Sequence, residues 1–225
     1  MPEILVTIPA YNEQDTLGKV IADIKDIMEG QDYKIQVVSD GSNDNTVKVV
    51  KENRITVWEK PHTGLADTFR TEMRLVNMLK PKVIVHFDAD GQYLAYDILR
   101  LIDEVRMGSQ LVLGNRLDGK IEHMPLTKKV FNRLGSLFFS LVIYKYVPDM
   151  TTGIRAFTLD VAKLPIYSEH TYTVEQVIKA RMKGYNVKSI PVTFLARKSG
   201  NSRLMKSSLH YLWNTVKNWD RMFRP

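Results

Sequence analysis

Short apolar segments and amphipathic segments alternate along the first half of the chain. The apolar segments are rich in β-branched residues, which is typical of buried strands. Between them, apolar residues recur at spacings of three and four, which predicts helices with one buried face. Strands joined by such helices form a parallel sheet with helices on both faces. The sequence therefore predicts an α/β fold, with strands over 4–10, 35–38, 55–58, 83–87 and 111–114 and helices over 17–27, 46–52, 65–79 and 98–105.

Polar residues follow three of these predicted strands. They are Tyr11-Asn12-Glu13, Asp40-Gly41-Ser42 and Asp88-Ala89-Asp90. Parallel strands place their carboxyl ends at the same edge of a sheet, and ligands bind there near the point where the strand order reverses. We therefore expect the three groups to converge on one cleft. The chain contains neither a Gly-x-Gly-x-x-Gly fingerprint nor a P-loop, so the usual dinucleotide and nucleoside-triphosphate motifs do not account for this cleft.

Two carboxylates, Asp88 and Asp90, follow the predicted strand over 83–87. Ionised carboxylates are costly to remove from water unless a cation joins them. Mg²⁺ and Mn²⁺ suit such a pair, because they accept one or two carboxylates and complete their coordination with phosphate and water. An Asp-x-Asp sequence is also compatible with a solvated turn, so these two residues alone leave both interpretations open.

The second half of the chain is richer in helical patterns. A strongly apolar segment over 131–143 predicts a helix that lies either in the core or against a membrane surface. A further helix is predicted over 174–183 and a strand over 187–194, and Pro191 places this strand at the edge of the sheet because it lacks an amide hydrogen. In the first half, His86 is expected to be a hydrogen-bonded core residue.

The net charge of +7 is concentrated at the C-terminus. Seven basic residues and one acidic residue lie within 197–225, so this tail carries +6. Apolar residues recur there at spacings of three and four, which predicts a basic amphipathic helix over 204–225. Such a helix binds an anionic partner (lipid, phosphate or nucleic acid) or packs on the sheet. The chain has no cysteine, no signal-peptide pattern and no apolar run of about 18 residues, as expected of a cytoplasmic protein.

Further motifs join the three polar clusters. Residues 8–13, 40–46 and 88–92 are followed by 114–116, 152–157 and 197–204. In this order the six segments resemble the family 2 glycosyltransferases of the GT-A fold, and in particular the polyprenyl-phosphate sugar synthases. The resemblance implies a Rossmann-like, mostly parallel sheet flanked by helices. It also implies a glycosyltransferase domain over 1–203, with a nucleotide-binding half (1–115) and an acceptor half (116–203), followed by the C-terminal helix over 204–225.

The resemblance assigns roles to individual residues. It implies that Mg²⁺ or Mn²⁺ binds to Asp88, Asp90 and Gln92, and that Asp90, Arg116, Arg197 and Arg203 act in catalysis. Ser39 stands where the family usually has an acid before Asp40, which leaves the preferred base open. The residues that the resemblance places on the nucleotide or the substrates are Pro9, Tyr11, Glu13, Val38, Asp40, Asp88, Ala89, Lys128, Lys129 and Arg155.

The implied reaction moves a hexose from a nucleotide sugar to a polyprenyl phosphate, with GDP-mannose and dolichyl phosphate as the expected substrates. A lipid phosphate has a second pKa of about 6 and needs no general base. A hydroxyl acceptor needs one, and the candidates are Asp149 and Glu175. The alternative is transfer to a glycan or protein hydroxyl, with a UDP-sugar as another donor.

The resemblance also implies a peripheral enzyme on the cytoplasmic face of the membrane, with no nucleic-acid partner. The chain either docks there by itself or is a truncated form of a protein with a membrane-anchoring part. Two rivals come from other classes of protein: a nucleic-acid-binding protein that uses the basic tail, and an inactive nucleotide-binding scaffold. Salt-dependent binding to nucleic acid would support the first, and GDP binding without turnover would support the second.

Overall fold

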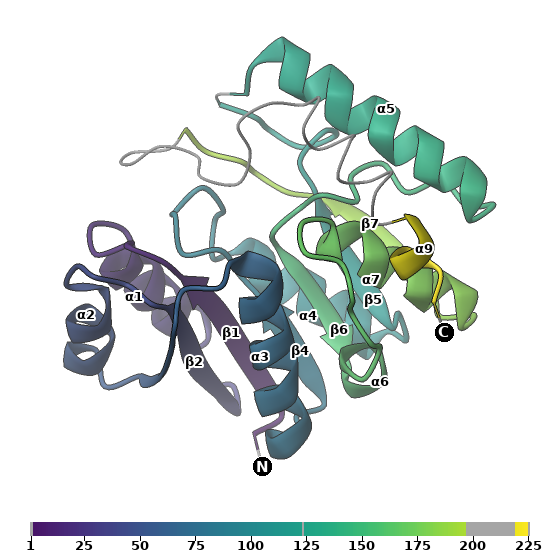
Figure 1. The fold of residues 1–225 in the computed structure, drawn as a ribbon. Coiled ribbons are helices and arrows are strands. Elements are labelled where there is room, and N and C mark those ends of the chain that lie inside the picture. The colour runs from purple at the N-terminus through teal and green to yellow at the C-terminus, as the bar shows by residue number, and fades with distance from the viewer. Residues whose placement is uncertain (1, 123, 197–218, 225) are drawn as a thin grey trace.

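The protein is a mixed α/β structure built on one seven-stranded sheet. A computed structural model describes residues 2–122, 124–196 and 219–224. The strands are β1 (Ile4–Ala10), β2 (Tyr33–Asp40), β3 (Thr56–Lys60), β4 (Val83–His86), β5 (Leu111–Asn115), β6 (Arg155–Thr158) and β7 (Val187–Pro191). Their order across the sheet is β3-β2-β1-β4-β6-β5-β7 (Figure 1). This mostly parallel sheet confirms the predicted fold class.

Helices cover both faces of the sheet. They are α1 (Leu17–Ile27), α2 (Thr46–Glu52), α3 (Leu65–Leu79), α4 (Asp97–Arg106), α5 (Leu126–Val142), α6 (Leu159–Ala162), α7 (Tyr172–Met182) and α9 (Trp219–Met222). The side chains of β1 alternate between two apolar clusters: Val6 packs with α1 and α4, whereas Leu5 packs with α3 and α7. The first half of the chain therefore has the elements that its hydrophobic periodicity predicts, with boundaries that differ by a few residues.

The strand order reverses between β1 and β4. β1 pairs in parallel with β2 on one side and with β4 on the other, so that Ala10 lies beside Ser39 and Thr7 beside His86. The carboxyl ends of β1, β2 and β4 therefore meet at one edge of the sheet. This edge is where open α/β sheets bind their ligands.

One strand, β6, is absent from the prediction. It lies between β4 and β5 and is antiparallel to both. With four residues it is too short to show a period in the sequence, and its partners are distant in the chain. β7 takes the edge position that Pro191 predicts, and it pairs in parallel with β5. Residues after 115 thus complete the same sheet that residues before 115 begin.

The predicted apolar helix over 131–143 and the predicted amphipathic helix over 204–225 have different outcomes. α5 lies at the rim of the molecule (Figure 1), and most of its large apolar side chains are exposed, so the helix is not a core helix. Within the predicted helix over 204–225, the described residues 219–222 form α9, where Met222 is buried in the cluster that includes α7. Residues 204–218 of that prediction lie outside the described residues.

Candidate active site

The first two polar clusters interlock at the carboxyl ends of β1 and β2. The Asn12 amide donates to Ser42 Oγ (3.1 Å), and the Asn43 amide donates to Asn12 Oδ1 (2.8 Å). The Glu13 amide donates to Thr46 Oγ1 at the start of α2 (2.8 Å). Pro9 and Val38 lie inside the sheet and are buried. The expected convergence of these two clusters is therefore confirmed, and the third cluster follows β4 at the same edge.

Asp40 organises the loop that follows β3. Its buried carboxylate accepts hydrogen bonds from the amides of Thr63 (3.0 Å) and Gly64 (2.9 Å) and lies 2.5 Å from Lys60 Nζ and 2.9 Å from His62 Nδ1. Burial by itself would raise the pKa of Asp40, but the Lys60 ammonium and the two amides outweigh it and hold the pKa below its usual value. The Asp40 carboxylate, which the resemblance places on the nucleotide, is thus already bonded to this loop.

The same loop covers Tyr11. The rings of Tyr11 and His62 stack with their centroids 4.1 Å apart and their planes 20° apart. Gly41 allows this approach, because a Cβ there would lie 2.6 Å from the His62 backbone nitrogen, and its φ of +70° also favours glycine. Residues 60–65 therefore lie against the residues that follow β1 and β2.

Asp88 and Asp90 follow β4 at the point where the strand order reverses. Both side chains are partly buried, and the Gln92 amide donates to Asp90 Oδ1 (3.1 Å). Burial, together with the negative charge of Asp90, raises the pKa of Asp88 to about 6. The guanidinium groups of Arg116 and Arg155 oppose this shift. A carboxyl pair that resists ionisation in this way is stabilised by an added cation.

Asp88 and Asp90 suit a hard divalent ion whose remaining ligands are phosphate or water. In the described part of the chain, no group of three or more His, Asp and Glu side chains is arranged to hold a metal by itself. Two carboxylates with open coordination positions are the usual protein contribution where Mg²⁺ also binds phosphates. Gln92 Nε2 donates to the Leu195 carbonyl (3.1 Å), so its amide ties residue 195 to the end of this segment. Ala89 is buried between the two acids.

A glycine from the second half of the chain packs directly on Asp88. A Cβ at Gly153 would lie 1.7 Å from Asp88 Oδ2, so a larger residue cannot be placed there without moving the carboxylate. The Gly153 amide donates to the Tyr93 hydroxyl (3.0 Å), which also lies 3.3 Å from Thr152 Oγ1. Burial raises the pKa of Tyr93 to about 12, so the phenol stays protonated. Sequence reasoning missed both residues as site residues, although Gly153 lies within the motif over 152–157.

Two buried arginines lie behind this surface. Arg116 makes a two-pronged ion pair with Asp149 (2.7 and 2.8 Å) and also donates to Thr151 Oγ1 (2.9 Å). Arg155 has no exposed surface, and it donates to the Thr152 carbonyl (2.5 Å) and to Gln176 Oε1 (2.8 Å). Both arginines therefore hold segment 149–153 in place, and the structure shows neither at the surface of the cleft.

The remaining predicted site residues that the structure describes lie at the start of α5 and after β1. Lys128 and Lys129 lie in the first turn of α5, where Lys128 is exposed and Lys129 is half-buried. Glu13 is half-buried and accepts from Thr16 Oγ1 (3.1 Å). Arg197 and Arg203 lie outside the described residues. His86 is fully buried, as predicted, and its Nδ1 lies 3.1 Å from Glu72 Oε2. The predicted hydrogen bond is not seen, since neither ring nitrogen has a hydrogen-bond partner among the described residues.

A cavity of about 330 Å³ opens beside Asp90. It lies between the start of α1 and the segment that follows Asp90, and Leu195 closes one side. Apolar and charged residues both line it, and a ligand on Asp90 would have open space next to it. The lining residues are Asp15, Thr16, Lys19, Val20, Asp23, Phe87, Asp90, Gly91, Tyr93, Leu94, Ala95 and Leu195.

Comparisons with known proteins agree with this geometry. The family model described as glycosyl transferase family 2 matches residues 5–163. A dolichyl-phosphate hexose transferase of Haloferax volcanii is 28% identical, with 90% of this chain and 86% of that protein covered. A UDP-N-acetylglucosamine–dolichyl-phosphate N-acetylglucosaminyltransferase of Methanococcus voltae is 30% identical over 84% of each chain.

The fold also matches a solved structure. Glucosyl-3-phosphoglycerate synthase from Mycobacterium tuberculosis, crystallised with Mn²⁺, uridine diphosphate and phosphoglyceric acid, superposes with a TM-score of 0.74. The superposition covers 100% of this chain and 80% of that one, at 17% sequence identity. At this level of identity the match concerns the architecture.

Proposed function

The chain belongs to glycosyl transferase family 2, and from this premise we propose that it moves a hexose from a nucleotide sugar to the phosphate of a polyprenyl phosphate. The resemblance in the sequence favours mannose from GDP-mannose. The name of the Methanococcus voltae relative supports a UDP-sugar as the alternative donor. Both relatives that we describe are named for a dolichyl-phosphate acceptor, which supports the lipid-phosphate class.

A phosphate acceptor is supported by the contacts of the two candidate general bases, Asp149 and Glu175. Asp149 is buried and ion-paired with Arg116, and its pKa is held low by that guanidinium against the effect of burial. Glu175 is buried, accepts hydrogen bonds from the amides of Tyr167 and Ser168, and pairs with Lys179 (2.9 Å). Both acids are therefore engaged in structure. A hydroxyl acceptor needs a free base, whereas an ionised phosphate does not.

In the proposed reaction the acceptor phosphate oxygen displaces the nucleoside diphosphate at the anomeric carbon in one step, with inversion. Asp88 and Asp90 would hold Mg²⁺ or Mn²⁺, which when bound supplies Lewis-acid neutralisation of the leaving diphosphate. Tyr11 and the loop over 60–64 would flank the nucleoside, and Asp40 holds that loop in place. Arg197 and Arg203 remain the proposed cationic donors to phosphate.

We assign Arg116 and Arg155 as positioning residues. Each binds segment 149–153 through hydrogen bonds, and this segment places Gly153 on Asp88. Their positive charges also lower the pKa of Asp88 and so favour its ionised, ion-binding form. This role replaces the direct contact with substrate that the resemblance implies for both.

The test uses the purified full chain with radiolabelled GDP-mannose, UDP-glucose or UDP-N-acetylglucosamine and Mn²⁺. Each donor is offered with a polyprenyl phosphate in detergent or with a soluble oligosaccharide. We expect label from one donor to enter the lipid fraction, and the family resemblance favours GDP-mannose as that donor. A chelator and Asp90→Ala should abolish the transfer, whereas Asp103→Ala, at an exposed acid on α4, should not. Label that enters only the oligosaccharide would contradict the acceptor class.

A further inference from the structure

α5 has an unusual distribution of side chains, with two serines buried beside Phe139 and most of its large apolar residues turned outward. Its buried residues are Ser136, Phe139 and Ser140. Its exposed large apolar residues recur mainly at spacings of three and four, which places them on the other side of the helix. A helix on a water-exposed surface normally shows the reverse pattern. The exposed residues are Leu126, Val130, Phe131, Leu134, Leu137, Phe138 and Leu141, which we call the outer face of α5.

The inner side of α5 is firmly attached to the rest of the protein. Ser136 Oγ accepts from the Met150 amide (3.1 Å), and Ser140 Oγ accepts from the Val147 amide (2.9 Å). Phe139 is 3% exposed and belongs to the apolar cluster of the sheet. The orientation of the helix is therefore set by specific contacts, and the outer face cannot turn inward without breaking them.

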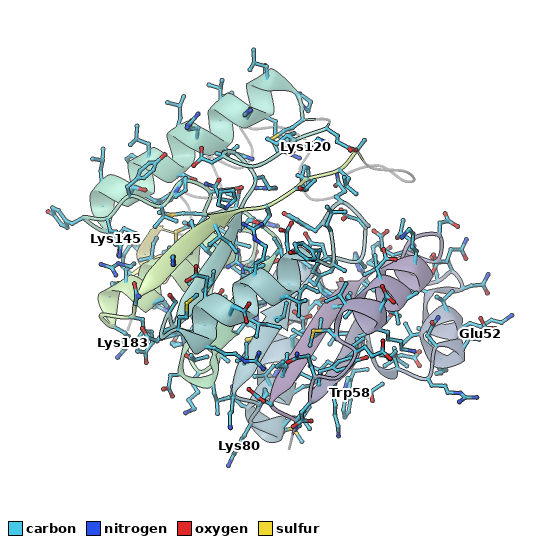
Figure 2. All side chains as sticks on the ribbon, turned by 180° about the vertical axis from the view of Figure 1, so that it is seen from behind. Glu52, Trp58, Lys80, Lys120, Lys145 and Lys183 are labelled. Carbon is cyan, nitrogen blue, oxygen red and sulfur yellow. The ribbon has the colours of Figure 1, made fainter. Side chains whose placement is uncertain are left out.

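The charged residues of α5 and of the segment after it are all basic, and one of them, Arg133, pairs with Asp118 (3.3 Å). Residues 126–147 include Lys128, Lys129, Arg133 and Lys145 and no Asp or Glu. Two tyrosines follow the helix, and Tyr144 and Tyr146 are 97% and 56% exposed. Basic residues and exposed aromatic residues beside an apolar face are the composition of helices that lie in the headgroup region of anionic membranes. Figure 2 shows side chains of α5 projecting away from the body of the protein, with Lys145 at one end.

We propose that the outer face of α5 docks on an anionic phospholipid bilayer, lying in the plane of the membrane between headgroups and acyl chains. The proposal rests on the proposed function only in that a polyprenyl-phosphate acceptor is itself held in a bilayer. No helix among the residues that the structure describes is long and apolar enough to cross a membrane. A helix with an apolar outer face and flanking basic residues attaches a protein to the membrane surface.

The position of α5 gives the docking a consequence for catalysis. The segment that α5 holds, 147–150, continues directly into Thr151, Thr152 and Gly153, and Gly153 packs on Asp88. A bilayer on the outer face therefore lies one helix away from the segment that borders the proposed metal site. This arrangement would let the phosphate of a membrane-held lipid approach the site while its chain stays in the bilayer.

The test is vesicle co-sedimentation of the full chain with two exposed leucines of the outer face replaced by glutamate. The variant Leu134→Glu/Leu141→Glu is compared with Met78→Glu/Met107→Glu, which changes apolar residues that are at least as exposed, on α3 and after α4. The vesicles contain phosphatidylcholine, with or without about 30 mol% phosphatidylglycerol as the anionic lipid. We expect wild type and the methionine variant to bind the anionic vesicles, and the leucine variant to bind about tenfold more weakly or worse.

The outcomes separate this proposal from its rivals and from the proposed function. Equal binding by all three proteins, or no binding by wild type, would overturn it. A wild-type dimer that the leucine variant dissociates, with vesicle binding unchanged, would assign the face to a second copy of the chain and also overturn it. Transfer to a short, water-soluble polyprenyl phosphate is measured in parallel. Its absence in wild type would refute the proposed function, while vesicle binding that depends on the outer face would still support docking.

Discussion

In the candidate active site, Asp88 is a carboxyl whose surroundings favour its protonated form. Its carboxyl lies partly buried beside Asp90, and its pKa of about 6 is above the ordinary value of 3.8. A raised folded-state pKa means that the folded protein binds this proton more tightly than the unfolded chain does. The metal-free protein should therefore lose stability as the pH rises from about 4 to about 6. A bound divalent ion would remove this cost.

Asp88→Asn tests this cost directly. At pH 8 without metal, the variant should have a free energy of unfolding about 1–3 kcal/mol higher than wild type, because it lacks the destabilising charge. At pH 4 the two proteins should be nearly equal, since wild-type Asp88 is then mostly protonated. Urea unfolding at both pH values with chelator present measures the difference. A variant that is less stable than wild type at pH 8 would show that burial does not dominate at Asp88.

Gly153→Ala tests the packing on Asp88. The added Cβ would lie 1.7 Å from Asp88 Oδ2, so the carboxylate must shift by more than about 1 Å, and such misplacements cost about 100-fold in activity. Gly135→Ala in α5 is the matched control, because a Cβ there meets nothing within 4 Å. The control should keep its activity and gain up to about 1 kcal/mol of stability from helix propensity. Steady-state transfer to acceptor in detergent measures both, and equal activities would argue against the assigned role of Gly153.

Among the elements, the connection between β3 and α3 depends most on a single side chain. Asp40 at the end of β2 accepts from the amides of Thr63 and Gly64, and Gly64 precedes the first residue of α3. It also binds Lys60 at the end of β3. One carboxylate therefore ties together two strands and the start of a helix, and the loop between them covers Tyr11.

Asp40→Asn should cost about 2 kcal/mol at pH 7, since it removes charge-assisted hydrogen bonds from a buried site. The folded-state pKa of Asp40 is depressed, so its contribution is present above the unfolded pKa near 3.8 and disappears as the pH falls below that value. The difference between variant and wild type should therefore shrink below about pH 4. Denaturation at pH 7 and pH 3 measures it, with Asp103→Asn at an exposed site as control. A cost that is the same at both pH values would mean that the charge is not the cause.

For the molecule as a whole, the site is formed by both halves of the sheet. Asp88 and Asp90 come from the first half, and Gly153 and its supporting arginine Arg155 come from the second. β6 joins the halves by pairing with β4 and β5. Ligand binding between them should therefore stabilise the entire fold in one transition.

Binding of the donor nucleotide with Mn²⁺ should raise the melting temperature of the full chain. A ligand at 100 times its Kd adds about 2.7 kcal/mol, which corresponds to about 5–10 °C for a protein of this size. Asp90→Ala should fold normally and show no shift, because the ion is then held by Asp88 alone. Differential scanning fluorimetry with GDP and UDP, with and without chelator, measures the effect. A shift that survives chelation would exclude a metal-dependent site.

The sequence was sufficient to predict the α/β class, the edge position of β7 and the meeting of the residues after β1 and β2. These features depend on hydrophobic period, on the missing amide hydrogen of Pro191 and on the geometry of parallel strands. All three are local properties or follow from general rules of topology. β6 escaped prediction because four residues are too few to show a period, and its place is set by partners distant in the chain.

Contacts between distant parts of the chain determine which candidate residues are already engaged in the fold. Asp149 pairs with Arg116, which lies 33 residues away in the sequence, and Gly153 packs on Asp88, which lies 65 residues away. No local pattern in the sequence encodes either contact. The same holds for α5, whose composition was compatible with a helix in the core or a helix lying against a membrane surface. Ser136 and Ser140 settled its orientation by hydrogen bonding inward, since buried polar groups need partners and the apolar residues then have to face outward.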